Sequence, residues 1–263
     1  MNTVLITGAG SGIGSAVAKS LAEREGIRLV LMGRRLEPLL VVKRSLKNSQ
    51  LHEAVSMDVS DSDAMVSWLS GEVANLTKYP LVAVFANAGI GGGNAFGEGD
   101  RWDEIIRINL TGTYITLMAC HPYLKQSKGV THALVTSSVL ARFGVPGQTA
   151  YVASKTGLLG LVRSLAMEWS ADGIMVNALC PGWVDTDMAR NSIQAMAEAQ
   201  GISYDQSKAQ QEEILPAKRI STPAEIAQWV DFLFSGLGEG CDKARIETFT
   251  GQALDINSGS WMG

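Results

Sequence analysis

Short apolar runs alternate with longer helix-compatible segments along the whole chain. The apolar runs predict strands at Val4–Thr7, Arg28–Met32, Ala54–Met57, Leu81–Ala86, His132–Thr136, Ile174–Leu179 and Thr250–Ile256. These runs are short, and most of them are mainly apolar rather than strictly alternating, which is typical of parallel strands buried on both faces. Alternating strands and helices predict one doubly wound parallel α/β sheet of about seven strands, and no repeat or linker indicates a domain boundary within residues 1–263.

Three segments depart from this simple alternation. A long helical pattern covers about 100–126, and we expect a local kink where Asn109-Leu110-Thr111-Gly112 interrupts it. The glycine-rich stretch Ile90–Gly99 is interpreted as a mobile loop near the mouth of a site. Residues 187–215 combine a helix-like run with a polar segment, and two interpretations stay open: a surface helical hairpin or a lid over a substrate.

Composition excludes some classes of function. The 263 residues are 46% hydrophobic with a formal net charge of −4, and the absence of basic clusters gives no reason to expect nucleic acid as a partner. No apolar run reaches membrane-spanning length and the first residues enter a strand at once, so we expect no signal peptide. Cys120, Cys180 and Cys241 have neither disulfide nor zinc-ligand spacing. They are interpreted as reduced thiols of a cytoplasmic protein, and no metal site is expected.

A glycine-rich turn follows the first strand and opens a helix. Gly8, Gly10, Gly12 and Gly14 lie in TGAGSGIG, directly before SAVAKSLAERE. Strand, glycine turn and helix in this order present backbone N–H groups that hold a pyrophosphate at a helix N-terminus. A tight turn that merely needs glycine is the alternative, but the flanking strand and helix favour dinucleotide binding.

The end of the second strand predicts which dinucleotide binds. A carboxylate at this place holds the ribose 2′-hydroxyl of NAD(H), whereas an arginine pairs with the 2′-phosphate of NADP(H). This chain has Gly33 followed by Arg34 and Arg35. We therefore favour NADP(H), with Arg34 as the phosphate ligand, and NAD(H) stays possible.

A serine, a tyrosine and a lysine form the candidate catalytic set. Tyr151 and Lys155 are four residues apart in a helix-compatible run, so their side chains leave the same helix face. An ammonium beside the phenol is expected to lower its pKa, which suits Tyr151 to proton transfer. Ser138 lies thirteen residues before Tyr151, after an apolar strand, which makes a chance pair of solvated side chains a poor explanation.

Six motifs in order along the chain resemble the short-chain dehydrogenase/reductase family, in its single-domain branch. They are TGxxxGxG at Gly8–Gly14, Asp58-Val59, Asn87-Ala88-Gly89, the N-x-x-G that begins at Asn109, the Ser138, Tyr151 and Lys155 set, and the PGxxxT that begins at Pro181. The resemblance is strongest to the 3-oxoacyl-carrier-protein reductase and ketoreductase members. It implies a Rossmann-type sheet and hydride transfer between a nicotinamide and a ketone or secondary alcohol.

The resemblance also implies roles for the residues of these motifs. Tyr151 would be the general acid and base, Lys155 would bind the nicotinamide ribose, Ser138 would hold the substrate oxygen, and Asn109 would anchor a water. The residues implied to bind the cofactor are Gly8, Ser11, Gly12, Ile13, Gly14, Arg34, Arg35, Asp58, Val59, Asn87, Ala88, Gly89, Tyr151, Lys155, Pro181, Gly182, Val184 and Thr186. Asp58 would meet the adenine amino group, Val184 the carboxamide, and Thr186 the phosphates.

The substrate is predicted only as a class. Candidate contacts are Ser138, Leu140, Gln148, Tyr151, Trp183 and Met188, a mainly apolar set without a fixed cation for a carboxylate. They favour a neutral or thioester-linked carbonyl or alcohol. A sugar, polyol or dihydrodiol dehydrogenase that uses NAD is the alternative, and a non-catalytic NADP-binding sensor is a second class. The family resemblance implies a homo-oligomer, a tetramer or a dimer.

Overall fold

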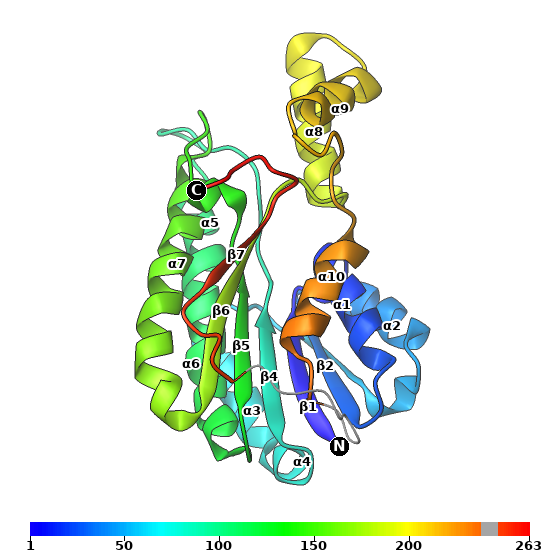
Figure 1. Ribbon diagram of the computed structural model, residues 1–263, viewed down its shortest axis with the longest axis vertical. Coiled ribbons are helices and arrows are strands. Elements are labelled where there is room, and N and C mark those ends of the chain that lie inside the picture. Colours follow the sequence, from blue (N-terminus) through cyan, green and yellow to red (C-terminus); the bar gives the residue numbers. More distant parts are fainter. Residues whose placement is uncertain (238–246) are drawn as a thin grey trace.

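The computed structural model describes residues 1–237 and 247–263 and is built on one seven-stranded parallel sheet (Figure 1). The strands are β1 (Asn2–Thr7), β2 (Ile27–Gly33), β3 (Glu53–Ser56), β4 (Leu81–Ala86), β5 (Thr131–Thr136), β6 (Ile174–Pro181) and β7 (Ala253–Ile256). Their order in the sheet is β3-β2-β1-β4-β5-β6-β7. All seven predicted strands are confirmed to within a few residues. The largest difference is at the last one, which begins three residues later than predicted.

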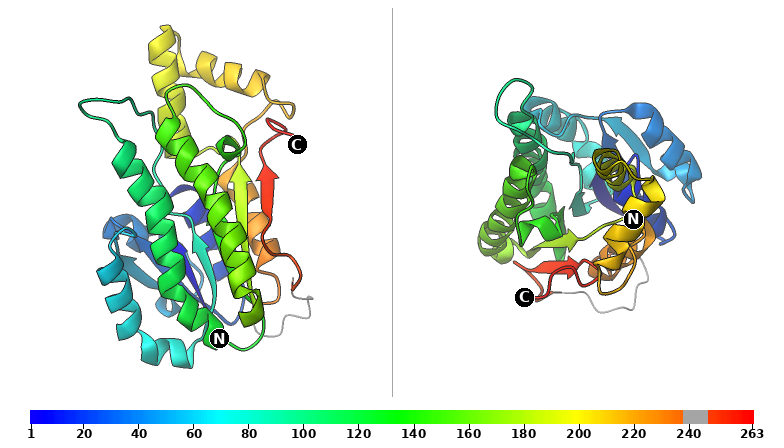
Figure 2. Two further views of the ribbon diagram at one scale, coloured as in Figure 1. Left: turned by 90° about the vertical axis from the view of Figure 1, so that its left-hand side faces the viewer. Right: turned by 90° about the horizontal axis from the view of Figure 1, so that it is seen from above.

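Helices cover both faces of the sheet (Figure 2). Helices α1 (Gly12–Ala22), α2 (Leu36–Ser45) and α10 (Pro223–Leu233) cover one face, and their buried residues share a core with β1 and β2. Helices α3 (Ser62–Gly71), α4 (Val73–Lys78), α6 (Gly112–Gln126) and α7 (Thr149–Trp169) pack on the other face. This arrangement confirms the predicted doubly wound fold. Thr222 and Glu225 form a capping box at the start of α10.

The sheet order creates a crevice where a ligand can bind. Strand β1 lies between β2 and β4, so the chain leaves β1 toward one face of the sheet and β4 toward the other. In open α/β sheets such a switch point leaves a gap outside the carboxyl ends of the strands. The glycine turn after β1, the Asn87 segment after β4 and the Ser138 segment after β5 all meet at this edge.

A π-helical turn interrupts the long helix between 102 and 126. The segment consists of α5 (Trp102–Ile106), the π turn (Arg107–Thr111) and α6, and the turn contains Asn109. The predicted irregularity is confirmed, but its nature differs, because π turns insert a residue rather than simply bending the helix. Gly112 allows the helix to pack closely against Val59, because a Cβ atom on Gly112 would lie 2.7 Å from the Val59 Cγ2 atom.

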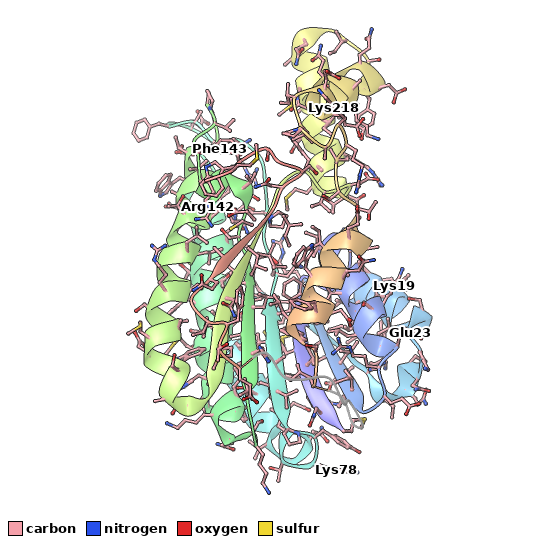
Figure 3. All side chains as sticks on the ribbon, viewed as in Figure 1. Lys19, Glu23, Lys78, Arg142, Phe143 and Lys218 are labelled. Atoms are coloured by element: carbon pink, nitrogen blue, oxygen red, sulfur yellow. The ribbon has the colours of Figure 1, made fainter. Side chains whose placement is uncertain are left out.

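Residues 187–213 form a helical hairpin at the carboxyl edge of the sheet. It consists of α8 (Asp187–Gln200) and α9 (Tyr204–Glu213), and it projects beyond the body of the molecule (Figure 1). The buried Ser207 hydroxyl donates to the Ile193 carbonyl across the hairpin, 3.2 Å away. Lys218 lies beside the hairpin at the same end as Arg142 and Phe143, whereas Lys78 marks the opposite end (Figure 3). The hairpin interpretation is therefore confirmed.

Two of the three cysteines lie in the described part of the chain. Cys120 and Cys180 are buried free thiols, and Cys241 lies outside the described residues. Within 1–237 and 247–263 no group of histidine, cysteine and carboxylate side chains has the arrangement of a metal site. None of the helices formed by these residues combines the length and apolar character that crossing a bilayer requires.

His52 makes the stability of the β2–β3 edge depend on pH. Its Nδ1 atom accepts a hydrogen bond from the Leu29 amide at 3.1 Å, and Nε2 lies 3.0 Å from the Lys47 carbonyl. Burial lowers the pKa of His52 below its ordinary value of 6.5, although the Lys47 carbonyl partly opposes this. Only the neutral ring can accept from Leu29, so protonation breaks that bond.

We therefore expect the free energy of unfolding to fall as the pH drops below 6.5, the ordinary imidazole pKa. In that range the unfolded chain takes up a proton that the folded chain resists, and this favours unfolding. Urea titrations between neutral and mildly acidic pH measure the effect. His52→Gln keeps an acceptor and a donor but does not titrate, so its pH dependence should be smaller. An identical pH dependence in both proteins would contradict this assignment.

Candidate active site

The turn after β1 packs so closely that two of its glycine positions have no room for a side chain. Gly8 and Gly12 have φ values of +66° and +52°, in the left-handed region that favours glycine. A Cβ atom on Gly8 would lie 2.9 Å from the Ala88 Cα atom, and one on Gly14 would lie 2.8 Å from Asn87 Nδ2. Helix α1 begins at Gly12, and its N-cap Ser11 makes no side-chain capping bond. This geometry fits a pyrophosphate held by backbone amides.

Asn87 ties the ends of three strands together beside this turn. Its Nδ2 atom donates to the Thr7 carbonyl at 3.2 Å, and its Oδ1 atom accepts from the Thr136 hydroxyl at 3.0 Å. The Thr7 hydroxyl in turn accepts from the amides of Asn87 and Ala88, both at 3.0 Å. The Asn87-Ala88-Gly89 segment therefore fixes the spacing of β1, β4 and β5, a structural role beside the predicted one.

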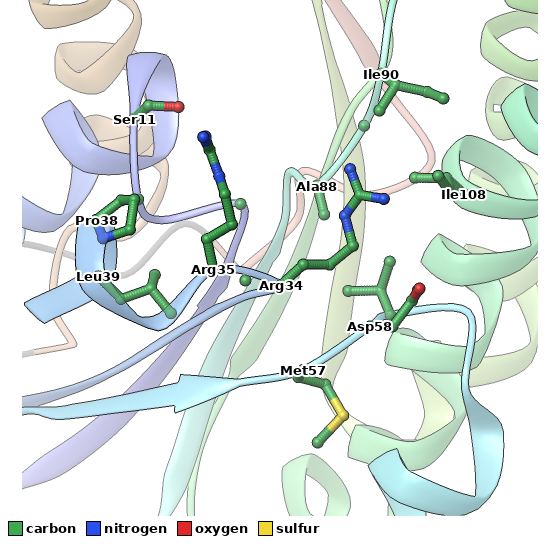
Figure 4. Close-up of a pocket in the computed structure, with 15 residues that line it drawn as sticks. Ser11, Arg34, Arg35, Pro38, Leu39, Met57, Asp58, Ala88, Ile90 and Ile108 are labelled. Carbon is green, nitrogen blue, oxygen red and sulfur yellow. The ribbon is translucent and has the colours of Figure 1, made fainter.

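A pocket beside the turn collects the residues predicted to bind the adenosine half of the cofactor (Figure 4). It is lined by Gly8, Gly10, Ser11, Gly33, Arg34, Arg35, Pro38, Leu39, Met57, Asp58, Val59, Ala88, Gly89, Ile90 and Ile108. The Arg35 side chain points toward Ser11, and the Arg34 side chain reaches across the pocket toward Ala88 and Ile108. Both arginines are exposed, and neither has an ion-pair partner within residues 1–237 and 247–263.

Asp58 is held ionised at the rim of this pocket. Burial raises its pKa, but the Ser60 hydroxyl and amide bonds and the charges of Arg107 and Arg34 outweigh burial, so the net pKa is lowered. The carboxylate accepts from the Ser60 amide at 2.9 Å and lies 3.8 Å from the Arg107 guanidinium. Asp61, rather than Asp58, caps α3, so the Asp58 carboxylate is not used as a helix cap.

Tyr151 and Lys155 lie one turn apart on α7, as predicted. The Lys155 Nζ atom is 5.6 Å from the centroid of the Tyr151 ring and donates to the Thr136 carbonyl at 2.8 Å. Ser138 follows β5, and its hydroxyl accepts from the Leu140 amide at 3.1 Å. The neighbouring Ser137 hydroxyl donates to the Lys155 carbonyl at 2.8 Å and so links the end of β5 to α7.

The pKa values of the pair differ from the sequence-based expectation. Burial raises the pKa of Tyr151 above its ordinary value, and the hydrogen bond with Ser138 opposes this only in part. Burial lowers the pKa of Lys155 to about 8. The predicted lowering of the phenol pKa is therefore wrong for this structure, because burial disfavours the phenolate more than the Ser138 hydrogen bond favours it. A protonated phenol at neutral pH suits Tyr151 as a proton donor.

Asn109 connects the π turn to the catalytic helix. Its side chain is fully buried, with Oδ1 accepting from the Ile90 amide at 2.8 Å and Nδ2 donating to the Ile90 carbonyl at 2.9 Å. The same Nδ2 atom donates to the Ser154 hydroxyl at 3.2 Å. Gly89 lies against both helices, since a Cβ atom there would be 3.2 Å from Asn109 Oδ1 and 3.5 Å from Lys155 Nζ.

The segment after β6 lies against the glycine turn. Ser221 donates to the Trp183 carbonyl at 2.9 Å, which places Val184 in an isolated parallel bridge with Ser221. Gly182 packs closely against Asn257, since a Cβ atom on Gly182 would lie 2.9 Å from the Asn257 Cα atom. Thr186 caps α8, and its Cγ2 atom would be 3.0 Å from a Cβ atom on Gly12. The predicted phosphate neighbour is therefore beside the predicted phosphate turn.

The predicted substrate contacts come from four segments that follow or precede the elements carrying the catalytic set. Leu140 belongs to a single turn of 3₁₀-helix (Val139–Ala141), and Gln148 immediately precedes α7. Trp183 follows β6, and Met188 is in the first turn of α8. Met188 also contacts the glycine loop, where its Sδ atom would be 3.0 Å from a Cβ atom on Gly91.

Two contacts at the site were not predicted from the sequence. Lys155 is oriented by the Thr136 carbonyl, and the first turn of α7 is bonded to Asn94 in the glycine loop. Backbone carbonyls and loop asparagines occur throughout the sequence, so no pattern singles these out. Ile13, a predicted cofactor residue, packs its side chain against the core beneath α1 and can offer only its backbone to a ligand.

Comparison with known proteins identifies the family. The family model for short chain dehydrogenases matches residues 2–197. The chain is 32% identical over 265 residues to a 3-oxoacyl-(acyl-carrier-protein) reductase of Staphylococcus aureus, covering 99% of this chain and 98% of the relative. The solved structure of actinorhodin polyketide ketoreductase with NADPH superimposes with a TM-score of 0.85 at 28% identity, covering 98% of this chain and 97% of that one.

A reductase of Brucella melitensis named for 3-oxoacyl-(acyl-carrier protein), solved with bound NAD, superimposes with a TM-score of 0.77 at 28% identity, covering 100% of this chain and 92% of that one. The chain belongs to the short-chain dehydrogenase family. It is an oxidoreductase that acts on a CH–OH or ketone group with NAD(P).

Proposed function

We propose that this enzyme reduces a neutral ketone, such as a 3-oxoacyl thioester, to a secondary alcohol with NADPH, and that Tyr151 donates the proton. The observation that carries the proposal is the position of Tyr151. Its phenol lies near the Ser138 hydroxyl, its pKa is raised, and one turn along its helix Lys155 donates to the Thr136 carbonyl at the end of β5. A phenol kept protonated beside a hydroxyl is suited to protonate a developing alkoxide.

The other residues of the site take supporting roles. Ser138 donates or accepts at the substrate oxygen, and Lys155, buried and bonded to Thr136, presents an ammonium to the nicotinamide ribose. Asn109 fixes the relative position of Ile90 and Ser154 and so holds the two helices of the site together. When a nicotinamide dinucleotide is bound, it supplies the hydride, and the protein supplies position and electrostatics.

The pair of arginines at the pocket supports NADP(H) as the cofactor. Both guanidinium groups line the pocket without an ion-pair partner in the described parts of the chain, and the position that a carboxylate takes in NAD-binding sites is Gly33. The ketoreductase neighbour was solved with NADPH, whereas the Brucella reductase was solved with NAD. The residues of this pocket support the phosphorylated dinucleotide as the preferred cofactor.

Arg34→Ala should raise the Kd for NADPH about 10- to 100-fold, the loss expected for a charge-assisted pair with phosphate. The Kd for NADH should change little, because NADH has no 2′-phosphate. Titration of cofactor fluorescence measures both constants. Arg44→Ala is the matched control, since Arg44 is an exposed arginine on the neighbouring helix α2 that pairs with Glu37. Equal losses of NADPH and NADH affinity in Arg34→Ala would contradict the phosphate assignment.

The lining of the site supports a neutral substrate. Leu140, Trp183 and Met188 supply apolar surface at the mouth, and Gln148 supplies one amide. The Staphylococcus aureus relative is named for a 3-oxoacyl carrier-protein thioester. We propose the same substrate class here, with the α8–α9 hairpin as the lid of a single-domain enzyme, because Met188 at its base already touches Gly91.

We further propose that the enzyme is a homo-oligomer. Large apolar side chains are exposed on α6 and α10, including Tyr114, Met118, Trp229 and Phe232. Apolar side chains gathered on helix faces are typical of subunit contacts. Light scattering during size-exclusion chromatography gives the mass in solution, and a monomer would contradict the proposal.

A panel of carbonyl compounds tests the proposed function. The loss of the near-ultraviolet absorbance of NADPH is followed with acyl thioesters bearing a 3-oxo group, cyclic diketones and sugars. The expected result is turnover of the thioesters and simple ketones with NADPH, and slower turnover with NADH. Tight NADPH binding without turnover of any carbonyl would contradict the proposed reaction, and preferential turnover of sugars or polyols with NAD would contradict the substrate class.

A further inference from the structure

The catalytic helix α7 is capped by a residue from a distant loop. Gln148 occupies the N-cap position but makes no side-chain capping bond. The cap comes from Asn94, whose Oδ1 atom accepts from the Thr149 hydroxyl at 2.9 Å and from the Ala150 amide at 2.9 Å. Ala150 immediately precedes Tyr151, so Asn94 fixes the turn of backbone from which the proposed proton donor projects.

A second contact sets the orientation of the Asn94 amide. Its Nδ2 atom donates to the Asp100 carboxylate at 3.2 Å, and a carboxylate can only accept, so Oδ1 must be the atom that faces α7. The same Asp100 oxygen accepts from the Trp102 amide at 3.0 Å, where α5 begins. Asn94 and Asp100 thus join the N-terminus of α7 to the N-terminus of the helix that leads to Asn109.

The glycines before Asn94 let its loop sit against the site. The Asn94 amide donates to the Gly147 carbonyl at 3.0 Å, and a Cβ atom on Gly93 would be 3.0 Å from that same oxygen. Gly91 leaves room for Met188 from the base of the hairpin. Residues 91–94 of the glycine loop therefore pack between the base of the hairpin and the N-terminus of α7. Phe96, further along the loop, is fully exposed.

We propose that Asn94 is a positioning residue that couples the seating of this loop to proton transfer by Tyr151. The inference rests on the proposed function, in which Tyr151 is the proton donor. Tyr151 is the third residue of α7, within the turn whose amides need external acceptors. With the loop seated, Asn94 supplies the acceptor and holds the phenol in place. With the acceptor removed, the first turn frays and the phenol loses its fixed position.

The dinucleotide pocket does not include Asn94, so the coupling should affect turnover and not cofactor binding. In Asn94→Ala we expect kcat to fall about 10- to 100-fold, the cost of a small misplacement of a catalytic group. The Kd for NADPH should stay within about threefold, since no pocket contact is lost. Amide hydrogen exchange at 149–152 should speed up, because the acceptor for the Ala150 amide is gone.

An exchange of the two side chains provides the rescue. In Asn94→Asp/Asp100→Asn the residue at 94 keeps an acceptor for Thr149 and Ala150, and the amide at 100 keeps the bond between the two side chains. Phe96→Ala is the matched control, because Phe96 lies in the same loop but is fully exposed and takes no part in these contacts. We expect the double variant and this control to have kcat values within about threefold of the wild type.

Two outcomes would overturn the proposal. One is a folded Asn94→Ala protein whose kcat and exchange rates match the wild type, and the other is a folded double variant as slow as Asn94→Ala. If Asn94→Ala does not fold, Asn94→Ser, whose hydroxyl is too short to reach both donors, is judged by the same two outcomes. Tyr151→Phe in the same assay distinguishes failure of the proposed function from failure of the Asn94 coupling. Full turnover in that variant means that the proposed function fails, whereas its loss beside a normal Asn94→Ala means that only the coupling fails.

Discussion

Replacing Tyr151 with phenylalanine should lower kcat for carbonyl reduction by about 10³-fold, within the range that a positioned general acid contributes. The ring and its packing are kept, and only the hydroxyl that is hydrogen-bonded to Ser138 is lost. Steady-state kinetics with NADPH and a responsive ketone measure the change. The Kd for NADPH should stay within about threefold, because the phenol acts on the substrate oxygen.

Tyr114→Phe is the matched control for this variant. Tyr114 is an exposed tyrosine on α6, so the same hydroxyl is removed away from the site. The control should keep wild-type kcat. Parallel losses of turnover and NADPH binding in Tyr151→Phe would mean that the phenol is structural, and a Tyr151→Phe enzyme with normal kcat would remove Tyr151 from the mechanism.

Gly14→Ala should have the second large effect, on folding and cofactor binding together. A Cβ atom there would collide with the Gly8 carbonyl and lie 2.8 Å from Asn87 Nδ2, and neither the backbone carbonyl nor the strand-linking amide can move freely. Overpacking of this kind destabilises a protein by about 1–3 kcal/mol. NADPH affinity should fall at least tenfold, since the amides that hold the pyrophosphate shift with Gly8.

The matched control is Gly71→Ala at the last residue of α3. No atom lies within 4 Å of a Cβ atom at that position, and its backbone is outside the left-handed region. Urea unfolding and cofactor titration compare the two variants, and Gly71→Ala should match or slightly exceed wild-type stability. Wild-type stability and affinity in Gly14→Ala would show that the turn tolerates a side chain and does not form a close phosphate cradle.

The sheet was predictable because it depends on patterns that are local in the sequence. Short, mainly apolar runs marked the strands. The glycine spacing of Gly8–Gly14 also indicated its function, because few residues other than glycine tolerate both the backbone conformation at Gly8 and the contact with Ala88. These features need no knowledge of the rest of the molecule.

The parts that sequence reasoning missed depend on contacts between distant segments. Asn94 and Ala150 are far apart in the chain, so the cap on α7 exists only once both loops are folded. The pKa of Tyr151 depends on burial by several elements, and the spacing to Lys155 alone gave the wrong direction. Likewise, the weak helix-forming sequence at Asn109 predicted an irregularity but not its π-helical form. Gly112, directly after the π turn, packs closely against Val59, a contact with a distant segment.

Transfer of deuterium from the nicotinamide to the product tests the central claim most directly. The enzyme is given NADPH labelled with deuterium at the transferred position together with a 3-oxoacyl thioester, and the product is analysed by mass spectrometry. Direct hydride transfer should give a secondary alcohol with one deuterium at the carbinol carbon, in an amount equal to the NADPH consumed. Consumption of NADPH without a labelled alcohol, or no consumption with any ketone, would contradict it.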